Sequence, residues 1–111
     1  MEIKERTKKD FIILDINGQI DMQTSPALRE VLKQKLDNKG PKLLVNFSKV
    51  QFIDSSGIAT LVEALKNSRS KKGILRLFGL SHSVKSVFQL AQLDKVFEVF
   101  NSENQAIEEE V

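Results

Sequence analysis

A short polar segment between two apolar stretches is the part of this sequence whose residue types and spacing could support chemistry. The segment is Asp54-Ser55-Ser56-Gly57. The apolar residues that follow it recur at spacings of three, four and seven, which predicts an amphipathic helix: Ile58, Leu61, Val62 and Leu65. Backbone N–H groups at the start of a helix lack partners, and the helix dipole favours negative charge there. The segment is therefore a place where a phosphate would be stable.

Two interpretations of this segment are open. In the first, Asp54 or Ser55 caps the helix, and Ser56 and Gly57 fill its first turn. In the second, a serine hydroxyl at the helix start is a functional group. The spacing alone favours capping, because an Asp-Ser pair is an ordinary signal for the beginning of a helix.

Strand patterns and helix patterns alternate along the chain, which predicts an α/β fold with crossover connections. Runs of branched and aromatic residues predict four strands and a preceding edge strand: residues 3–7, 11–16, 43–47, 74–78 and 96–100. At 111 residues the chain has the usual size of one domain, which we place at residues 1–111.

Capping signals predict where the other helices begin and end. Ser25 is expected to cap a helix that has Pro26 at its first position, and Gly40 is expected to end it. Gly73 is expected to turn the chain after the central helix. Ser81 is the expected cap of a third helix, and the spacing Ser102-x-x-Gln105 fits a capping box for a fourth.

The composition excludes several classes of function. There is no cysteine, and a single histidine, His82, cannot form a multi-histidine metal site, so we expect no metal and no cofactor. Seventeen basic and fifteen acidic residues give a net charge of +2 without tryptophan or tyrosine, so we expect no direct contact with nucleic acid. No apolar run approaches the roughly 20 residues that cross a bilayer, and the first residues lack the pattern of a signal peptide. We expect a cytoplasmic protein with no membrane insertion.

Three segments resemble one known family. Asp54-Ser55-Ser56-Gly57, preceded by Phe52 and Ile53, resembles the phosphorylation motif of bacterial anti-sigma factor antagonists, which are small single-domain members of the STAS family. The segment from Gly18 to Leu28 is similar to the Gly-x-Leu-Asp turn and first helix of that family, and Asn46 to Val50 matches the strand and turn before the motif. The resemblance extends from about Ile3 to about Ile107.

The resemblance implies a single STAS domain, with a mixed sheet of about four to five strands and about four helices. It also implies a binding protein that is not an enzyme: the unphosphorylated form binds an anti-sigma factor, itself a serine kinase, and so frees the sigma factor. Phosphorylation at Ser55 would release the antagonist from the anti-sigma factor, and a phosphatase acting on phospho-Ser55 would restore binding. The residues implied at the partner surface are those of the motif and one earlier aspartate: Asp21, Asp54, Ser55, Ser56, Gly57 and Ile58. Asp21 could instead form a local Asx turn.

Two departures from the family pattern leave the partner open. Gln19 stands where these proteins often carry glutamate, and Ala59 where a second glycine is common. The alternative is another STAS role, as a subunit of a lipid-trafficking ABC transporter or of a stress-signalling complex. A third class, nucleotide binding by the domain itself, has no supporting motif, because no glycine-rich phosphate loop followed by lysine occurs. A hydrolase built on His82 would need an elbow motif that the sequence lacks.

Overall fold

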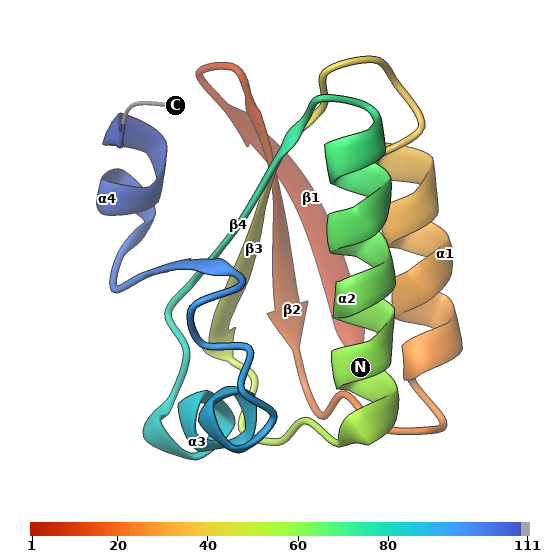
Figure 1. Cartoon of the computed structure of the whole chain (residues 1–111), viewed down its shortest axis with the longest axis vertical. Coiled ribbons are helices and arrows are strands. Elements are labelled where there is room, and N and C mark those ends of the chain that lie inside the picture. Colours follow the sequence, from red (N-terminus) through yellow and green to blue (C-terminus); the bar gives the residue numbers. More distant parts are fainter. Residues whose placement is uncertain (110–111) are drawn as a thin grey trace.

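A five-stranded sheet forms the centre of the computed structural model, which describes residues 1–109 (Figure 1). The strands are β1 (Glu2–Lys8), β2 (Phe11–Asn17), β3 (Lys42–Lys49), β4 (Ile74–Phe78) and β5 (Glu98–Phe100). The helices are α1 (Ser25–Lys35), α2 (Ser55–Ser70), α3 (His82–Leu90) and α4 (Glu103–Glu108). The predicted α/β fold with a mixed sheet is confirmed.

The strands lie in the sheet in the order in which they occur in the chain, β1-β2-β3-β4-β5. β1 is antiparallel to β2, whereas the other neighbouring pairs are parallel. Over residues 1–109 the strand order never reverses, so the sheet lacks the switch point at which doubly wound sheets bind nucleotides. The topology therefore gives no support to nucleotide binding by the domain.

Helices cover both faces of the sheet. α1 and α2 lie side by side on one face, α4 lies on the other, and α3 sits near the end of the sheet where α2 begins (Figure 1). The apolar stripe of α1, with Leu28 and Leu32, and that of α2, with Leu61 and Leu65, are buried in the main core. A smaller cluster lies around Ala106 of α4. Because both faces are covered, the central strand β3 has buried apolar residues on both of its sides: Leu43, Leu44, Val45 and Phe47.

α4 is held at its end by a buried arginine that interrupts the apolar pattern of β4. The Arg76 side chain is 1% exposed, and its guanidinium donates to the carbonyl oxygens of Ala106 at 2.8 Å and Glu109 at 3.0 Å. It also pairs with Glu98 at 3.2 Å. The last carbonyls of a helix have no partners inside the helix, so Arg76 satisfies two of them and fixes α4 to the sheet.

The end of α1 differs from the prediction. α1 ends at Lys35 with Leu36 as its C-cap, so the prediction that Gly40 caps this helix is wrong. Gly40 adopts a positive φ of 65° in the loop, where its N–H donates to the carbonyl of Lys71 at 2.8 Å. The glycine therefore joins the loop after α1 to the end of α2.

Gly73 also has a different role from the one predicted. Lys72, with φ of 57°, makes the left-handed turn after α2. A Cβ atom on Gly73 would lie 2.5 Å from the carbonyl oxygen of Pro41, so glycine is required there for close backbone approach.

The last strand is shorter than predicted. β5 begins at Glu98, because the N–H groups of Val96 and Phe97 donate back to the carbonyl of Leu93 at 3.0 and 3.2 Å. These two residues therefore belong to a turn after α3.

Candidate functional site

Asp54 is the N-cap of α2. Its Oδ1 atom accepts hydrogen bonds from the backbone N–H groups of Ser56 at 2.9 Å and Gly57 at 3.2 Å, and from the Ser56 hydroxyl at 2.6 Å. The capping interpretation thus applies to Asp54 and not to Ser55. An aspartate cap of this kind satisfies N–H groups that would otherwise lack partners.

The charge of Asp54 is stabilised by the same contacts. The hydrogen bond from the Ser56 hydroxyl, followed by those from the backbone N–H groups of Gly57 and Ser56, holds the pKa of Asp54 below its usual range. The carboxylate is therefore ionised at neutral pH, directly beside Ser55.

Ser55 is the first residue of α2 and is exposed. Within residues 1–109 its hydroxyl makes no hydrogen bond, so capping does not occupy it. A hydroxyl in this position is accessible to an enzyme that modifies serine.

The loop before α2 is paired with the loop before α1. Ile20 and Ile53 form a parallel bridge, in which the Ile20 N–H donates to Phe52 O at 3.0 Å and the Asp54 N–H donates to Ile20 O at 3.1 Å. Two segments that lie about 30 residues apart in the sequence therefore form one continuous surface, as expected for loops that leave the same ends of neighbouring parallel strands.

Asp21 makes the local turn that the sequence allows. Its Oδ1 atom accepts from the N–H groups of Gln23 at 2.9 Å and Thr24 at 3.0 Å, which is an Asx turn leading into α1. The side chain is partly exposed in the loop paired with the start of α2. The turn and a partner contact are compatible, and the partner contact stays a prediction.

The start of α1 corrects the role of Ser25. The N-cap is Thr24, without a capping hydrogen bond from its side chain, and Ser25 is the first helical residue, so the prediction that Ser25 caps α1 is wrong. The Ser25 hydroxyl instead lies 2.6 Å from the Asp21 carbonyl oxygen and 2.9 Å from the Ser56 hydroxyl. Ser25 thus joins the starts of α1 and α2, a contact that no local sequence signal predicts.

The other two predicted residues lie beneath the surface. Gly57 is buried, and a Cβ atom there would lie 2.6 Å from Ile20 and 2.7 Å from Ile53, so its lack of a side chain lets α2 approach the paired loops. Ile58 is 9% exposed and belongs to the main core. In this conformation Gly57 and Ile58 support the surface from below, while Ser55 is presented on it.

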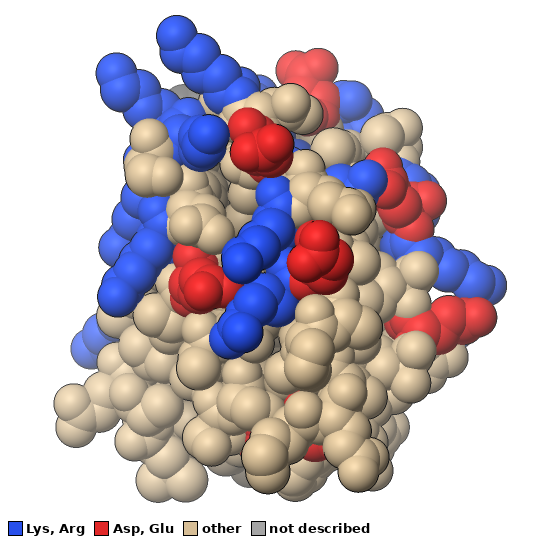
Figure 2. Space-filling model, turned by 90° about the vertical axis from the view of Figure 1, so that its right-hand side faces the viewer, with Lys and Arg blue, Asp and Glu red and all other residues tan. Residues whose placement is uncertain are grey.

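Charge is distributed unevenly over the face formed by α1 and α2. Figure 2 shows that charged side chains gather over the end where these helices finish and are almost absent from the end where they begin. Two large apolar side chains in this region are exposed. Phe52, three residues before Ser55, is 47% exposed, and Met22, in the paired loop before α1, is 77% exposed. The sequence places Phe52 in the apolar stretch before the motif, and only the structure reveals its exposure. A surface with few charged side chains and with exposed apolar groups is typical of a protein-binding site.

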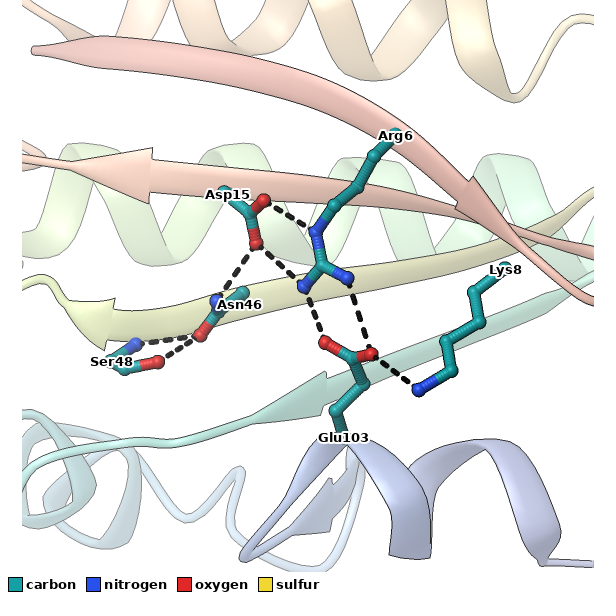
Figure 3. A network of polar contacts seen from close by, with 6 residues as sticks. All are labelled: Arg6, Lys8, Asp15, Asn46, Ser48 and Glu103. Atoms are coloured by element: carbon teal, nitrogen blue, oxygen red, sulfur yellow. Dashed lines mark hydrogen bonds and ion pairs between the residues drawn. The ribbon is translucent and has the colours of Figure 1, made fainter.

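A second polar feature lies on the opposite face of the sheet (Figure 3). The Arg6 guanidinium pairs with Asp15 at 2.7 Å and with Glu103 of α4, and Lys8 lies 3.3 Å from Glu103. Asn46 donates to Asp15 at 2.8 Å. The adjoining groove has a volume of about 300 Å³. Because its charged groups bind one another across β1, β2 and α4, this network attaches α4 to the sheet.

The network makes the stability of the protein depend on pH. The hydrogen bond from Arg6 lowers the pKa of Glu103 in the folded protein. The ionised carboxylate therefore stabilises the fold at pH values above its unfolded pKa, and this stabilisation is lost as the pH falls below about 4. Arg6 is 41% exposed, so solvent screens the pair. We expect Glu103→Gln to lower the free energy of unfolding at pH 7 by about 0.5–1 kcal/mol, and by less at pH 3. Urea denaturation at both values measures this.

Glu108→Gln is the matched control, since Glu108 is an exposed glutamate of the same helix and has no place in the network. A loss on Glu103→Gln that is equal at pH 7 and pH 3 would contradict the electrostatic explanation.

No group of three or more potential metal-ligating side chains occurs within residues 1–109. In the same range, no helix combines the length and the apolar character needed to span a membrane.

The sequence matches the STAS domain over residues 2–106, and the chain belongs to this family. It is 33% identical over 105 residues to the anti-sigma-B factor antagonist of Listeria monocytogenes, covering 95% of this chain and 91% of that protein. An anti-sigma factor antagonist from Mycobacterium paratuberculosis has a similar structure, with a TM-score of 0.86, 22% identity and coverage of 96% and 90%. The Bacillus cell fate determinant SpoIIAA in its phosphorylated form aligns with a TM-score of 0.71, 18% identity and coverage of 96% of both chains.

Proposed function

We propose that this protein is an anti-sigma factor antagonist whose binding is controlled by phosphorylation at Ser55. The observation that carries the proposal is an exposed serine hydroxyl at the first position of α2, which makes no hydrogen bond within residues 1–109 and lies on a surface that has little charge. The similarity to anti-sigma-B factor antagonists over nearly the whole of both chains supports this class of partner.

The partner is an anti-sigma factor that is also a serine kinase. In the unphosphorylated form, the surface around Asp21, Ser55 and Phe52 docks on this kinase in the cytoplasm and frees the sigma factor. Ser55 is then the substrate of the kinase, and this chain performs no catalysis itself. A phosphatase that acts on phospho-Ser55 resets the switch. The existence of a phosphorylated form of SpoIIAA is a precedent within the same fold.

Phosphorylation would oppose docking for electrostatic reasons. A phosphate adds a charge of about −1.5 to −2 at neutral pH. At Ser55 that charge would stand beside the ionised Asp54, on a surface whose exposed Met22 and Phe52 have to lose water when the partner binds. Repulsion and desolvation both act against the complex, whereas the helix start itself tolerates negative charge.

The test uses Ser55→Ala. Tagged wild-type protein is used to capture partners from the native cytoplasm, and the anti-sigma factor recovered is purified and mixed with each variant and ATP. We expect ATP to release the wild type, with one phosphate found on it by intact-mass measurement. The Ser55→Ala variant should gain no phosphate and stay bound, with an unchanged fold, because Ser55 contributes no capping bond.

Ser70→Ala, at the far end of the same helix, is the control and should behave as the wild type. Phosphate uptake by Ser55→Ala equal to that of the wild type would reject Ser55 as the site. Recovery of a transporter ATPase without any anti-sigma factor would favour the other STAS role.

A further inference from the structure

Three turns meet at the end of the molecule that lies opposite the start of α2. They are the turn between β1 and β2, the loop between α1 and β3, and the turn between α2 and β4, all at the top of Figure 1. The Gly40 N–H joins the last two, since it donates to Lys71 O at 2.8 Å. The first turn lies beside them, because Lys42 Nζ lies 3.8 Å from the Asp10 carboxylate. The three turns therefore form one continuous surface.

Five exposed lysines at this end have no acidic partner. Within residues 1–109 none of them forms an ion pair. We name them the basic end: Lys9, Lys33, Lys39, Lys71 and Lys72. The last three line one hollow of about 380 Å³ together with Asp37 and Ser70. Figure 2 shows lysine and arginine side chains projecting from this end. Because the whole chain has a net charge of only +2, positive charge is concentrated here.

Lysine occupies two turn positions of the basic end where the backbone favours another residue. Lys9 has φ of 54° and Lys72 has φ of 57°. In this left-handed region a Cβ atom crowds the following carbonyl oxygen, and glycine, asparagine or aspartate is more usual. Lysine at these two positions therefore costs stability, and within the described residues no ion pair compensates for it. What the two side chains supply is exposed positive charge, which points to a function for that charge.

We propose that the basic end binds the surface of a membrane that contains anionic phospholipids. Lysine is a compact, strongly hydrated point charge and lacks the planar donor fork of arginine. Protein interfaces are depleted in lysine, and nucleic-acid sites usually add aromatic side chains, none of which occurs in residues 8–10, 36–42 and 71–73. Clusters of about four to eight basic residues are instead typical of electrostatic attraction to anionic lipid.

The contact with lipid would be electrostatic and reversible. Leu36 and Pro41, the large apolar residues of the same three segments, are buried, so the basic end offers no apolar side chain for insertion into the bilayer. Attraction between charges alone weakens as salt screens them. Binding to anionic lipid should therefore fall steeply as the ionic strength rises.

α2 separates the basic end from Ser55. Its 16 residues span about 24 Å, whereas charges in solution are screened beyond about 8–10 Å. A protein bound to lipid through the basic end would keep Ser55 facing away from the membrane, and phosphate on Ser55 would leave lipid binding unchanged. Lipid binding at the basic end thus goes beyond the proposed function and does not depend on it.

The test measures cosedimentation of the full chain with vesicles of phosphatidylglycerol and phosphatidylcholine in equal parts, and with vesicles of phosphatidylcholine alone. We expect binding to the anionic vesicles only, with lower affinity at higher salt. A lysine near an anionic surface contributes about fivefold to the binding constant, so Lys9→Asn combined with Lys72→Asn should weaken binding about 25-fold. Asparagine tolerates the left-handed region, so this variant should stay folded, which thermal melts check.

Lys4→Gln combined with Lys49→Gln is the matched control. It removes the same charge from two exposed lysines that line the groove on the sheet beside Asn17, away from the basic end, and it should bind the anionic vesicles as the wild type does. An equal loss in both double variants, or equal binding to the two kinds of vesicle, would overturn the inference. Tighter binding to duplex DNA than to the anionic vesicles in the same buffer would overturn it too.

Ser55→Asp separates this inference from the proposed function. The variant should bind the anionic vesicles as tightly as the wild type, and a tenfold loss would contradict the independence of the two ends. A wild-type protein that binds anionic vesicles but takes up no phosphate from the anti-sigma factor kinase would reject the proposed function alone.

Discussion

Ser55→Asp is expected to weaken binding to the anti-sigma factor by roughly tenfold or more. A carboxylate at this position would be pressed against a partner that receives a neutral hydroxyl, and an unpaired charge at an interface has to be desolvated without compensation. Asp54 is already ionised beside it, which adds repulsion. The effect should be smaller than that of phosphorylation, because aspartate carries less charge than phosphoserine.

The same change should leave the fold as stable as before or slightly more stable. Ser55 is exposed and its hydroxyl is unbonded in the described structure, so no contact is lost. Negative charge in the first turn of a helix contributes about 0.3–1 kcal/mol, which offsets the nearness of Asp54. Binding and stability should therefore change in opposite directions.

Calorimetric titration against the purified anti-sigma factor, together with thermal melts, measures both effects. Ser55→Asn is the matched control, since it has nearly the same size without the charge and should bind more tightly than Ser55→Asp. Unchanged affinity together with a destabilised fold would indicate that Ser55 has a structural role and would count against the switch.

Local elements were predictable where one physical cause dominates. β4 has the predicted bounds, Ile74–Phe78, because four of its five residues are apolar, as a strand covered on both faces requires, and Arg76 is the one exception. α3 follows its predicted cap, since Ser81 accepts the Val84 N–H at 3.3 Å. The Ser102 cap of α4 likewise accepts from Gln105 at 3.2 Å. Each of these signals is contained within a few residues.

Contacts between elements were not predictable, because periodicity reports burial but not which side chains meet. Ser25 and Ser56 are 31 residues apart in the sequence, and the Arg6 guanidinium reaches Glu103 across 97 residues. Ser25 therefore resembled a helix cap, although its hydroxyl binds across to the neighbouring helix. The same holds for the candidate site: the sequence indicated Ser55, but only the three-dimensional structure shows that Asp54, and not Ser55, makes the capping hydrogen bonds.

Burial along α2 is also wider than its apolar stripe. Thr60 lies outside that stripe, yet it is 1% exposed, and its hydroxyl donates to Ser56 O at 2.9 Å. A threonine that bonds to the preceding turn can be buried at little cost, since its polar group is satisfied within the helix. The buried side of α2 thus includes a small polar side chain that the hydrophobic pattern omits.

Ile58→Ala is expected to cause the largest loss of stability, about 2–5 kcal/mol, because truncation of a buried isoleucine removes apolar contacts and leaves a cavity. That is a large part of the 5–15 kcal/mol by which domains are usually stable. Urea denaturation should show a lower midpoint with a similar slope. Thr60→Ala should cost less, since it removes fewer buried atoms, and the exposed Lys66→Ala should change stability by no more than about 0.5 kcal/mol.

Ile58 also separates support of the site from contact with the partner. Its side chain is 9% exposed and packs in the core, three residues after Ser55. At a temperature where Ile58→Ala is still folded, we expect its affinity for the anti-sigma factor to stay within about threefold of the wild type. Truncation of a side chain that does not touch the partner changes the binding free energy by less than about 1 kcal/mol. A folded variant with a tenfold loss of affinity would show that Ile58 itself reaches the interface. An unfolding midpoint equal to that of Lys66→Ala would instead show that this position contributes little to the core.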